Sequence, residues 1–144
     1  MSKTRILLVD DEAPFIETMS KRLMKRNLVV ECSYSGTEAL ARLEKGEDLD
    51  VVILDVKMPG MDGISTLREI KRMRPLVEVI MLTGHGTLES GIEGMKLGAF
   101  DYLTKPCDID KLMAKIQEAA EAKSQREEKI TQARIRDIEL RRGD

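Results

Sequence analysis

The chain has 144 residues, of which 42% are hydrophobic and 35% charged, so it can form one domain without disulfides or a structural metal. Basic and acidic residues nearly balance, at 24 and 26, which argues against nucleic-acid binding, and no apolar run is long enough to span a membrane. The two cysteines lie far apart, only one histidine is present and the N-terminus lacks a signal-peptide pattern. We therefore expect a cytoplasmic protein without a Cys/His zinc site.

Five short segments rich in β-branched and other apolar residues predict strands, at residues 5–9, 29–33, 51–54, 77–82 and 100–103. A segment with apolar residues at helical spacing follows each strand. Pro14 lies in the first turn of the first helix, and Ser35 with Glu38 forms a capping box for the second. Gly98 ends the fourth helix and Asp108 caps the fifth. This alternation predicts an α/β fold with a single doubly wound, five-stranded parallel sheet.

From residue 123 the chain becomes strongly charged, and no Gly or Pro interrupts it before Gly143. Two interpretations remain open: one long helix that continues the fifth and pairs with a partner helix, or a solvated and partly frayed tail. A heptad repeat here is poor, because Lys123 and Arg126 fall where apolar residues would be needed.

Polar side chains follow four of the predicted strands. They are Asp10 and Asp11 after the first, Asp55 after the third, Thr83 at the end of the fourth and Lys105 after the fifth. Because sites in open parallel sheets form outside the carboxyl ends of the strands, we expect these side chains to converge on one edge of the sheet.

Three carboxylates packed together would repel one another unless one is protonated or a cation offsets their charge. An oxygen-only set with no His or Cys favours Mg²⁺ over zinc. A carboxylate beside Mg²⁺ can attack phosphorus to form an acyl phosphate. Lys105 would then neutralise the phosphoryl oxygens, and Thr83 would donate a hydrogen bond to them.

Four segments carry a resemblance to a known family: residues 9–11 (Val-Asp-Asp), 55–63 (Asp-Val-Lys-Met-Pro-Gly-Met-Asp-Gly), 83–86 (Thr-Gly-His-Gly) and 98–106 (Gly-Ala-Phe-Asp-Tyr-Leu-Thr-Lys-Pro). With these motifs, in this order, the chain resembles the receiver domain of two-component response regulators. The resemblance implies a flavodoxin-like sheet of order 2-1-3-4-5, with residues 1–122 as the receiver domain and 123–144 as a charged helical extension or linker. Residues 95–102 most resemble receivers of ATPase-type transcriptional activators.

The resemblance also implies roles for individual residues. Asp55 would be the phosphoacceptor, and Asp10, Asp11, Asp55 and the backbone carbonyl of Lys57 would surround Mg²⁺. Lys105 would contact the phosphoryl group.

Further roles follow from the same resemblance. Thr83 and Tyr102 would form the switch pair, and Lys105 would precede a cis bond to Pro106. His85 and the side chain of Lys57 would tune dephosphorylation.

We expect a phosphorylation switch that takes its phosphoryl group from a sensor histidine kinase, since the chain has no nucleotide-binding loop. Such a switch catalyses only its own modification and is not otherwise an enzyme. The change would reach the face formed by the fourth and fifth helices and the fifth strand. That face, or the C-terminal helix, would mediate any homodimer. The sequence does not define the output partner. We expect the chain to bind neither nucleic acid nor a membrane.

Two alternatives stay in view. One is a receiver-like interaction or dimerisation module that never takes phosphate. The other is a Mg²⁺-dependent phosphohydrolase, which is disfavoured because such enzymes space their first aspartates as D-x-D, whereas Asp10 and Asp11 are adjacent.

The fourth helix contains two interior glycines, Gly91 and Gly94. Each lowers helix stability by about 1 kcal/mol relative to alanine, so we expect a soft, easily deformed helix that phosphorylation orders or shifts.

Overall fold

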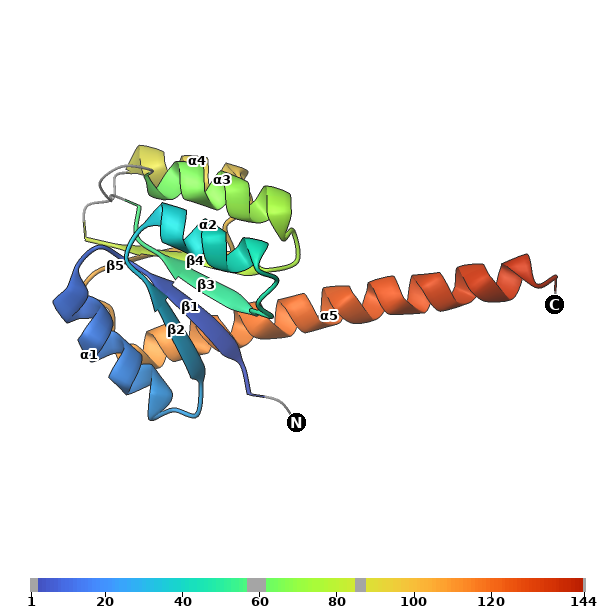
Figure 1. Ribbon diagram of the computed structural model, residues 1–144, viewed down its shortest axis with the longest axis horizontal. Helices are drawn as coiled ribbons and strands as arrows, with labels where there is room; N and C mark the ends of the chain where they lie inside the picture. Colours follow the sequence, from blue (N-terminus) through green and yellow to red (C-terminus); the bar gives the residue numbers. More distant parts are fainter. Residues whose placement is uncertain (1–2, 57–61, 85–87, 144) are drawn as a thin grey trace.

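A five-stranded parallel sheet forms the centre of the molecule, with strand order β2-β1-β3-β4-β5 (Figure 1). This computed structural model describes residues 3–56, 62–84 and 88–143. The strands are β1 (Arg5–Val9), β2 (Val29–Ser33), β3 (Val51–Leu54), β4 (Glu78–Thr83) and β5 (Asp101–Thr104). The predicted fold class and strand order are confirmed, and only β4 and β5 begin and end one residue later than expected.

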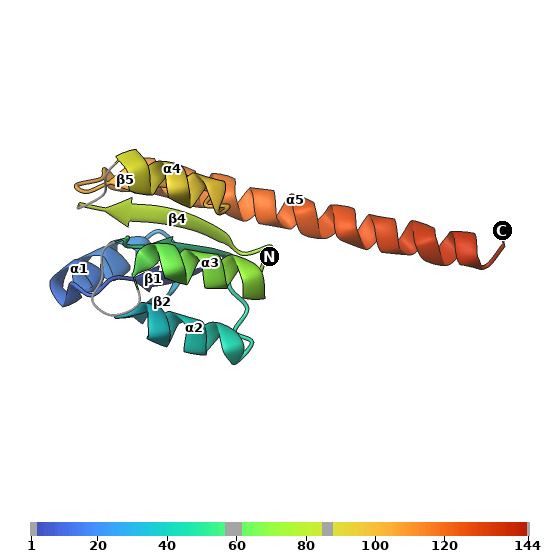
Figure 2. The ribbon, with the colours of Figure 1, turned by 90° about the horizontal axis from the view of Figure 1, so that it is seen from above.

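Helices cover both faces of the sheet (Figure 2). They are α1 (Ala13–Met24), α2 (Gly36–Glu44), α3 (Gly63–Met73), α4 (Leu88–Lys96) and α5 (Ile109–Arg141). Alternate residues of β1 point to opposite sides: Ile6 packs with α1 and α5, and Leu7 packs with α2 and α3. Because β3 lies in the middle of the sheet, all four of its residues are buried, which explains its continuous apolar sequence.

The helix ends follow the predicted local signals. The hydroxyl of Ser35 accepts a hydrogen bond from the Glu38 amide at 3.1 Å, and the carboxylate of Asp108 accepts one from the Asp110 amide at 3.3 Å. Gly98 follows α4 with a φ of +102°, a backbone conformation that favours glycine. These caps determine where the helices begin and end relative to the sheet.

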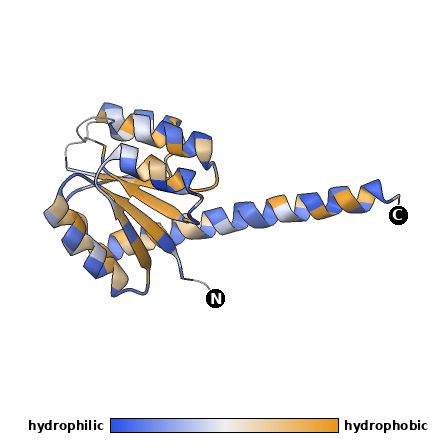
Figure 3. Ribbon diagram, in the orientation of Figure 1, coloured by the Kyte–Doolittle hydropathy of each residue, from blue (hydrophilic) through white to orange (hydrophobic). Residues whose placement is uncertain are grey.

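The fifth helix continues far beyond the sheet. It has 33 residues, which corresponds to about 50 Å, and from residue 124 onward every described side chain is exposed. Figure 3 shows that this projecting part is mostly hydrophilic, in contrast to the strands. Of the two interpretations of the C-terminal segment, the continuous helix is confirmed.

Lys123 and Arg126, which interrupt the heptad, face the body of the protein. Lys123 Nζ lies 3.2 Å from Asp50 Oδ1, and Arg126 Nη1 lies 3.3 Å from Glu78 Oε1. Glu78 also pairs with Lys71 at 3.3 Å. These contacts attach the start of the projecting helix to Asp50, the residue before β3, and to Glu78, the first residue of β4. Within the described residues, no helix is long and apolar enough to cross a membrane.

Candidate functional site

The acids of the site follow two neighbouring strands and lie at the same edge of the sheet. Asp10 and Asp11 follow β1 directly, and Asp55 follows β3. The Asp55 amide donates a hydrogen bond to the carbonyl of Val9 at 3.0 Å, and the Asp10 amide donates one to the carbonyl of Ser33 at 3.2 Å. The parallel ladder therefore places the acids side by side, as the sequence predicts.

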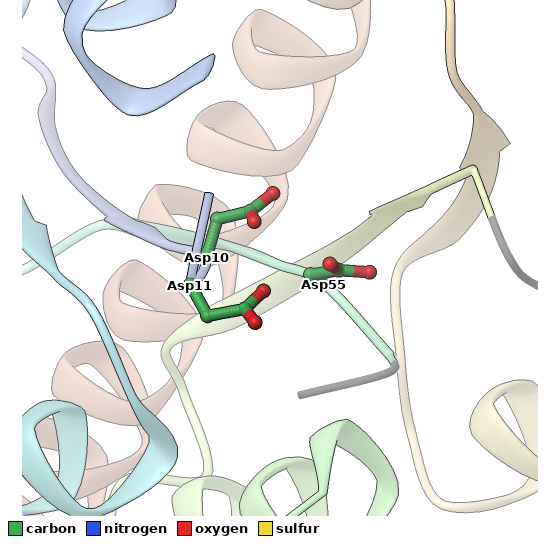
Figure 4. A group of neighbouring side chains, drawn as sticks. All are labelled: Asp10, Asp11 and Asp55. Atoms are coloured by element: carbon green, nitrogen blue, oxygen red, sulfur yellow. The ribbon is translucent and has the colours of Figure 1, made fainter. Parts of the chain in front are cut away.

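The three carboxylates form one cluster (Figure 4), in which one oxygen from each lies within 4.8 Å of the others. Asp10 and Asp55 are both 1% exposed, whereas Asp11 is exposed at the rim. Burial of two acids beside a third is costly unless a positive charge is present. Oxygen donors of this kind fit a hard divalent cation, with its remaining positions open to water and other oxygen ligands.

Lys105 supplies one positive charge from the β5 side. Its Nζ lies 2.6 Å from Asp10 Oδ2 and 3.9 Å from Asp55 Oδ2. The Lys105 amide donates to the carbonyl of Thr83 at 3.0 Å, which ties it to the end of β4. The peptide bond from Lys105 to Pro106 is cis, as predicted.

Burial raises the pKa of Asp10 above its ordinary value, and the opposing effect of hydrogen bonds from Lys105 and from the Glu12 amide does not cancel it. The charge of Asp55 raises the pKa of Asp10 further. For Lys105, burial alone would lower the pKa, but the hydrogen bond and charge of Asp10, with contributions from Asp55 and Glu12, outweigh it and raise the pKa. Lys105 is therefore a permanent cation at neutral pH, and Asp10 is an acid whose ionised form is not fully compensated.

Thr83 and Tyr102, the predicted switch residues, lie on adjacent strands. Thr83 is fully buried at the end of β4. The Tyr102 hydroxyl is shielded from solvent and has no hydrogen-bond partner among the described residues. The Tyr102 ring lies beside Gly91 of α4, where an added Cβ would be 3.5 Å from the ring. A buried hydroxyl without a partner is unfavourable, so the present position of the Tyr102 side chain carries an energetic cost.

An apolar groove of about 680 Å³ lies between α4 and β5. Its wall includes Leu88, Ile92 and Met95 of α4, which are 81%, 48% and 46% exposed, and the ring of Tyr102 lines the same groove. Exposed apolar side chains gathered in one place are typical of interaction surfaces. Tyr102 thus lies between this surface and the interior of the protein.

Some predicted residues lie outside the described part of the chain, and others were not predicted. Lys57 and His85 fall in the segments that the structure does not describe. Glu12 and Phe15 were not predicted to contact Lys105, although Glu12 is a third consecutive acid after β1. Gly63 is the last residue of the motif at 55–63; a Cβ there would overlap the backbone of Asp55 and Val56, so only glycine fits.

Comparisons with known proteins agree with this geometry. A family model described as the response regulator receiver domain matches residues 6–117. The chain is 38% identical over 117 residues to the transcriptional regulatory protein ZraR of Salmonella typhimurium, and 35% identical over 119 residues to its DNA-binding transcriptional regulator NtrC. These matches cover 81% and 83% of this chain but only 26% and 25% of the relatives, so the chain spans about a quarter of their length.

Among solved structures, the chain is similar to a response regulator receiver domain protein from Clostridium thermocellum. The TM-score is 0.80 at 40% identity, over 84% of this chain and 97% of the other. The similarity therefore extends over nearly the whole of a protein that consists of this fold.

Proposed function

The chain belongs to the family of response regulator receiver domains of two-component systems, and on that premise we propose that Asp55 is its phosphoacceptor. The resemblance drawn from the sequence is thereby confirmed, including the likeness to receivers of ATPase-type activators. One observation supports the assignment of residues most directly. The buried carboxylate of Asp55 lies in one cluster with Asp10 and Asp11, 3.9 Å from the ammonium of Lys105.

The phosphoryl group would come from a phosphohistidine of a sensor histidine kinase. An oxygen of Asp55 attacks phosphorus, and the new O–P bond forms as the P–N bond of the phosphohistidine breaks. The departing imidazole keeps the electron pair and is protonated. Hydrolysis reverses the modification: a water oxygen attacks phosphorus, the O–P bond breaks, and the carboxylate and inorganic phosphate are released.

We propose Mg²⁺ as the cation, held by Asp10, Asp11, Asp55 and, on the family resemblance, by the backbone carbonyl of Lys57. When bound, it would offset the negative charge that accumulates on the transferring phosphoryl group. The protein contributes the rest: the ladder bonds hold Asp55 and Asp10 in place, and Lys105 supplies a preorganised positive charge where the oxygens arrive. In this role the chain modifies only itself and acts on no other substrate.

The signal would pass from Asp55 to the groove between α4 and β5. The Thr83 hydroxyl, at the end of β4, would donate a hydrogen bond to the phosphoryl group and leave its present position. Tyr102, whose hydroxyl lacks a partner among the described residues, would then move with it and change the surface lined by Ile92 and Met95. Output proteins, or a second copy of the chain, would recognise the altered groove. On the family resemblance, His85 and Lys57 would tune the rate of dephosphorylation.

Intact mass tests this proposal. The wild type is incubated with a small phosphodonor such as acetyl phosphate, with Mg²⁺ or with EDTA, beside Asp55→Asn. One added phosphoryl group on the wild type only, and only with Mg²⁺, is the expected result. If the wild type binds Mg²⁺ by calorimetry but never gains the phosphoryl mass, even during rapid quenching, the chain is a phosphate-independent interaction module instead.

A further inference from the structure

Glu12 occupies the N-cap position of α1 but does not behave as a cap. Its backbone is extended there, and among the described residues its side chain makes no capping hydrogen bond. Instead, Glu12 Oε1 lies 3.3 Å from Lys105 Nζ, on the other side of the site. N-cap side chains normally accept a bond from the first turn of their own helix, so this side chain serves another contact.

The ammonium of Lys105 is held on the α1 side of the site by two groups outside the acid cluster. Glu12 contacts it from the rim, with a side chain that is 54% exposed. The ring of Phe15, in the first turn of α1, lies under it, with the centroid 3.9 Å from Nζ. This distance allows a cation–π interaction. Asp55, in contrast, is 3.9 Å from the same nitrogen, beyond hydrogen-bond distance.

We propose that Glu12 is a positioning residue that holds Lys105 against α1 and so competes with the incoming phosphoryl oxygens for its ammonium. This inference rests on the proposed role of Asp55. Before transfer, Lys105 is shared among Asp10, Glu12 and the Phe15 ring. In the transition state and in the acyl phosphate, the phosphoryl oxygens take over the ammonium, and the contact with Glu12 is given up.

This order of events predicts that Glu12 affects the rate of phosphorylation but not the rate of hydrolysis. An interaction present in the free protein but lost in the transition state slows the forward reaction. Hydrolysis starts from the acyl phosphate, in which the contact is already absent, so the lifetime of the phosphate does not depend on Glu12. Glu12 therefore sets how readily the domain is phosphorylated and leaves unchanged how long it stays so.

Two substitutions separate this contact from general electrostatics. Glu12→Gln removes the charge, and with it some repulsion of an anionic donor. Glu12→Asp keeps the charge but is one methylene shorter, so it no longer reaches Lys105 and becomes a better N-cap. We expect both to raise the phosphorylation rate constant with acetyl phosphate about two- to five-fold, the scale of an exposed ion pair, with unchanged phosphate lifetime. Glu17→Asp, at a glutamate on α1 that forms an exposed pair with Lys21 at 3.3 Å, is the matched control and should leave both rates unchanged.

A second measurement needs no phosphate. Because Lys105 Nζ lies over the Phe15 ring, the ε-methylene protons of Lys105 should show an upfield ring-current shift by NMR, and Phe15→Leu gives the value without the ring. In Glu12→Asp and Glu12→Gln this upfield shift should shrink, because the ammonium is no longer held against α1.

Three results would overturn the inference: an increased rate in Glu12→Gln alone, a changed phosphate lifetime in both variants, or an unchanged ring-current shift. The first would mean that Glu12 acts only by its charge. If instead the wild type takes no phosphoryl group, the proposed function fails, and the ring-current shift still decides whether Glu12 positions Lys105.

Discussion

Asp10, which we propose as a metal ligand, weakens the fold when no metal ion is bound. Its carboxylate is buried beside Asp55, and burial raises its pKa, so the folded protein binds a proton there more tightly than the unfolded chain. By linkage, this group favours folding at low pH, below its unfolded pKa, and that contribution is lost as the pH rises through the folded pKa. At neutral pH and without a bound metal ion, the ionised Asp10 is therefore a source of instability, even beside Lys105.

Asp10→Asn should accordingly stabilise the metal-free protein. In EDTA at pH 7 we expect the free energy of unfolding to rise by about 0.5–2 kcal/mol in urea denaturation, the range of single stabilising substitutions. The gain should shrink as the pH falls through the pKa of Asp10. With Mg²⁺ the order should reverse, because the variant lacks a metal ligand. Equal stability of the two proteins in EDTA would mean that Lys105 already compensates the charge in full.

Whether a contact at the site could be predicted from the sequence depends on which part of the fold positions the side chain. Asp10, Asp55 and Lys105 were predictable because parallel strands bring their carboxyl ends to one edge, whatever the side chains do. The contacts of Glu12 and Phe15 with Lys105 were not, because they depend on the direction in which α1 leaves the site. That direction is a property of the packed protein.

Among the helices, α4 carries two glycines that the structure distinguishes. A Cβ on Gly94 would overlap the sulfur of Met81, whose side chain is fully buried in the sheet. For a Cβ on Gly91, the nearest atoms among the described residues belong to the Tyr102 ring, at an ordinary 3.5 Å. Gly94 thus allows α4 to approach β4 closely, a packing reason for a glycine that the sequence associated with softness alone. Whether α4 is soft stays a prediction.

Matched alanine substitutions test this difference. Gly91→Ala should be neutral or stabilise the protein by up to about 1 kcal/mol through helix propensity. Gly94→Ala should be about 1–3 kcal/mol less stable than Gly91→Ala, because the added methyl must displace Met81. Thermal and urea denaturation of the two variants, side by side, give the comparison. Equal stabilities would show that Met81 moves aside at no cost.

Ion pairs attach the start of the projecting part of α5 to the body of the protein. Lys123 is 6% exposed and lies between Asp50 and Glu127, at 3.2 and 3.3 Å. Burial alone would lower the pKa of Lys123, but the hydrogen bonds that its ammonium donates to Asp50 and Glu127 outweigh this effect and raise the pKa. The stabilising contribution of Lys123 is therefore fully present below its unfolded pKa and is lost only as the pH rises through the still higher folded value.

Lys123→Ala should cost about 1–3 kcal/mol of unfolding free energy, since it leaves the partly buried carboxylate of Asp50 without the ammonium of Lys123. The cost should be the same at about pH 6 and pH 9, because both lie below the pKa of Lys123 in either state. Amide exchange should become faster in the helix around residues 120–130. Lys129→Ala, at an exposed position on the same helix, is the control and should change stability by less than about 0.5 kcal/mol. A similar loss in both variants would mean that α5 is held by its apolar contacts alone.

For the whole molecule, the sequence predicted the sheet and the order of its strands better than the end of the chain. Buried strands and capped helices carry strong local signals, and the receiver motifs supplied the topology. The segment after residue 122 carries isolated apolar residues and nearly balanced charge, so its sequence alone did not decide between a helix and a frayed tail. In the structure this segment is a helix whose start is held by Lys123 and Arg126. Their partners, Asp50 and Glu78, lie more than forty residues earlier in the chain, so no local sequence signal indicates these contacts. The domain boundary at residue 122 stays a prediction.

Two surfaces could join two copies of the chain, and they can be told apart. The groove beside α4 exposes Ile92 and Met95 next to Tyr102, the residue that we expect to respond to phosphate. The end of α5 exposes Ile138 and Leu140, 15 and 17 residues after Lys123, the last buried residue of that helix. Of these two surfaces, only the groove includes Tyr102, through which we expect the phosphorylation of Asp55 to act. Self-association that depends on phosphorylation should therefore use the groove.

Sedimentation velocity with Mg²⁺, with and without beryllofluoride as a phosphoryl mimic, tests this expectation. We expect the wild type to shift from monomer toward dimer with the mimic, Ile92→Glu to stay monomeric in both states, and Leu140→Glu to behave as the wild type does. A dimer abolished by Leu140→Glu and retained in Ile92→Glu would instead assign self-association to the helix. A wild type that is monomeric in both states would leave the groove as a surface for a different protein, and the switch would act through hetero-association alone.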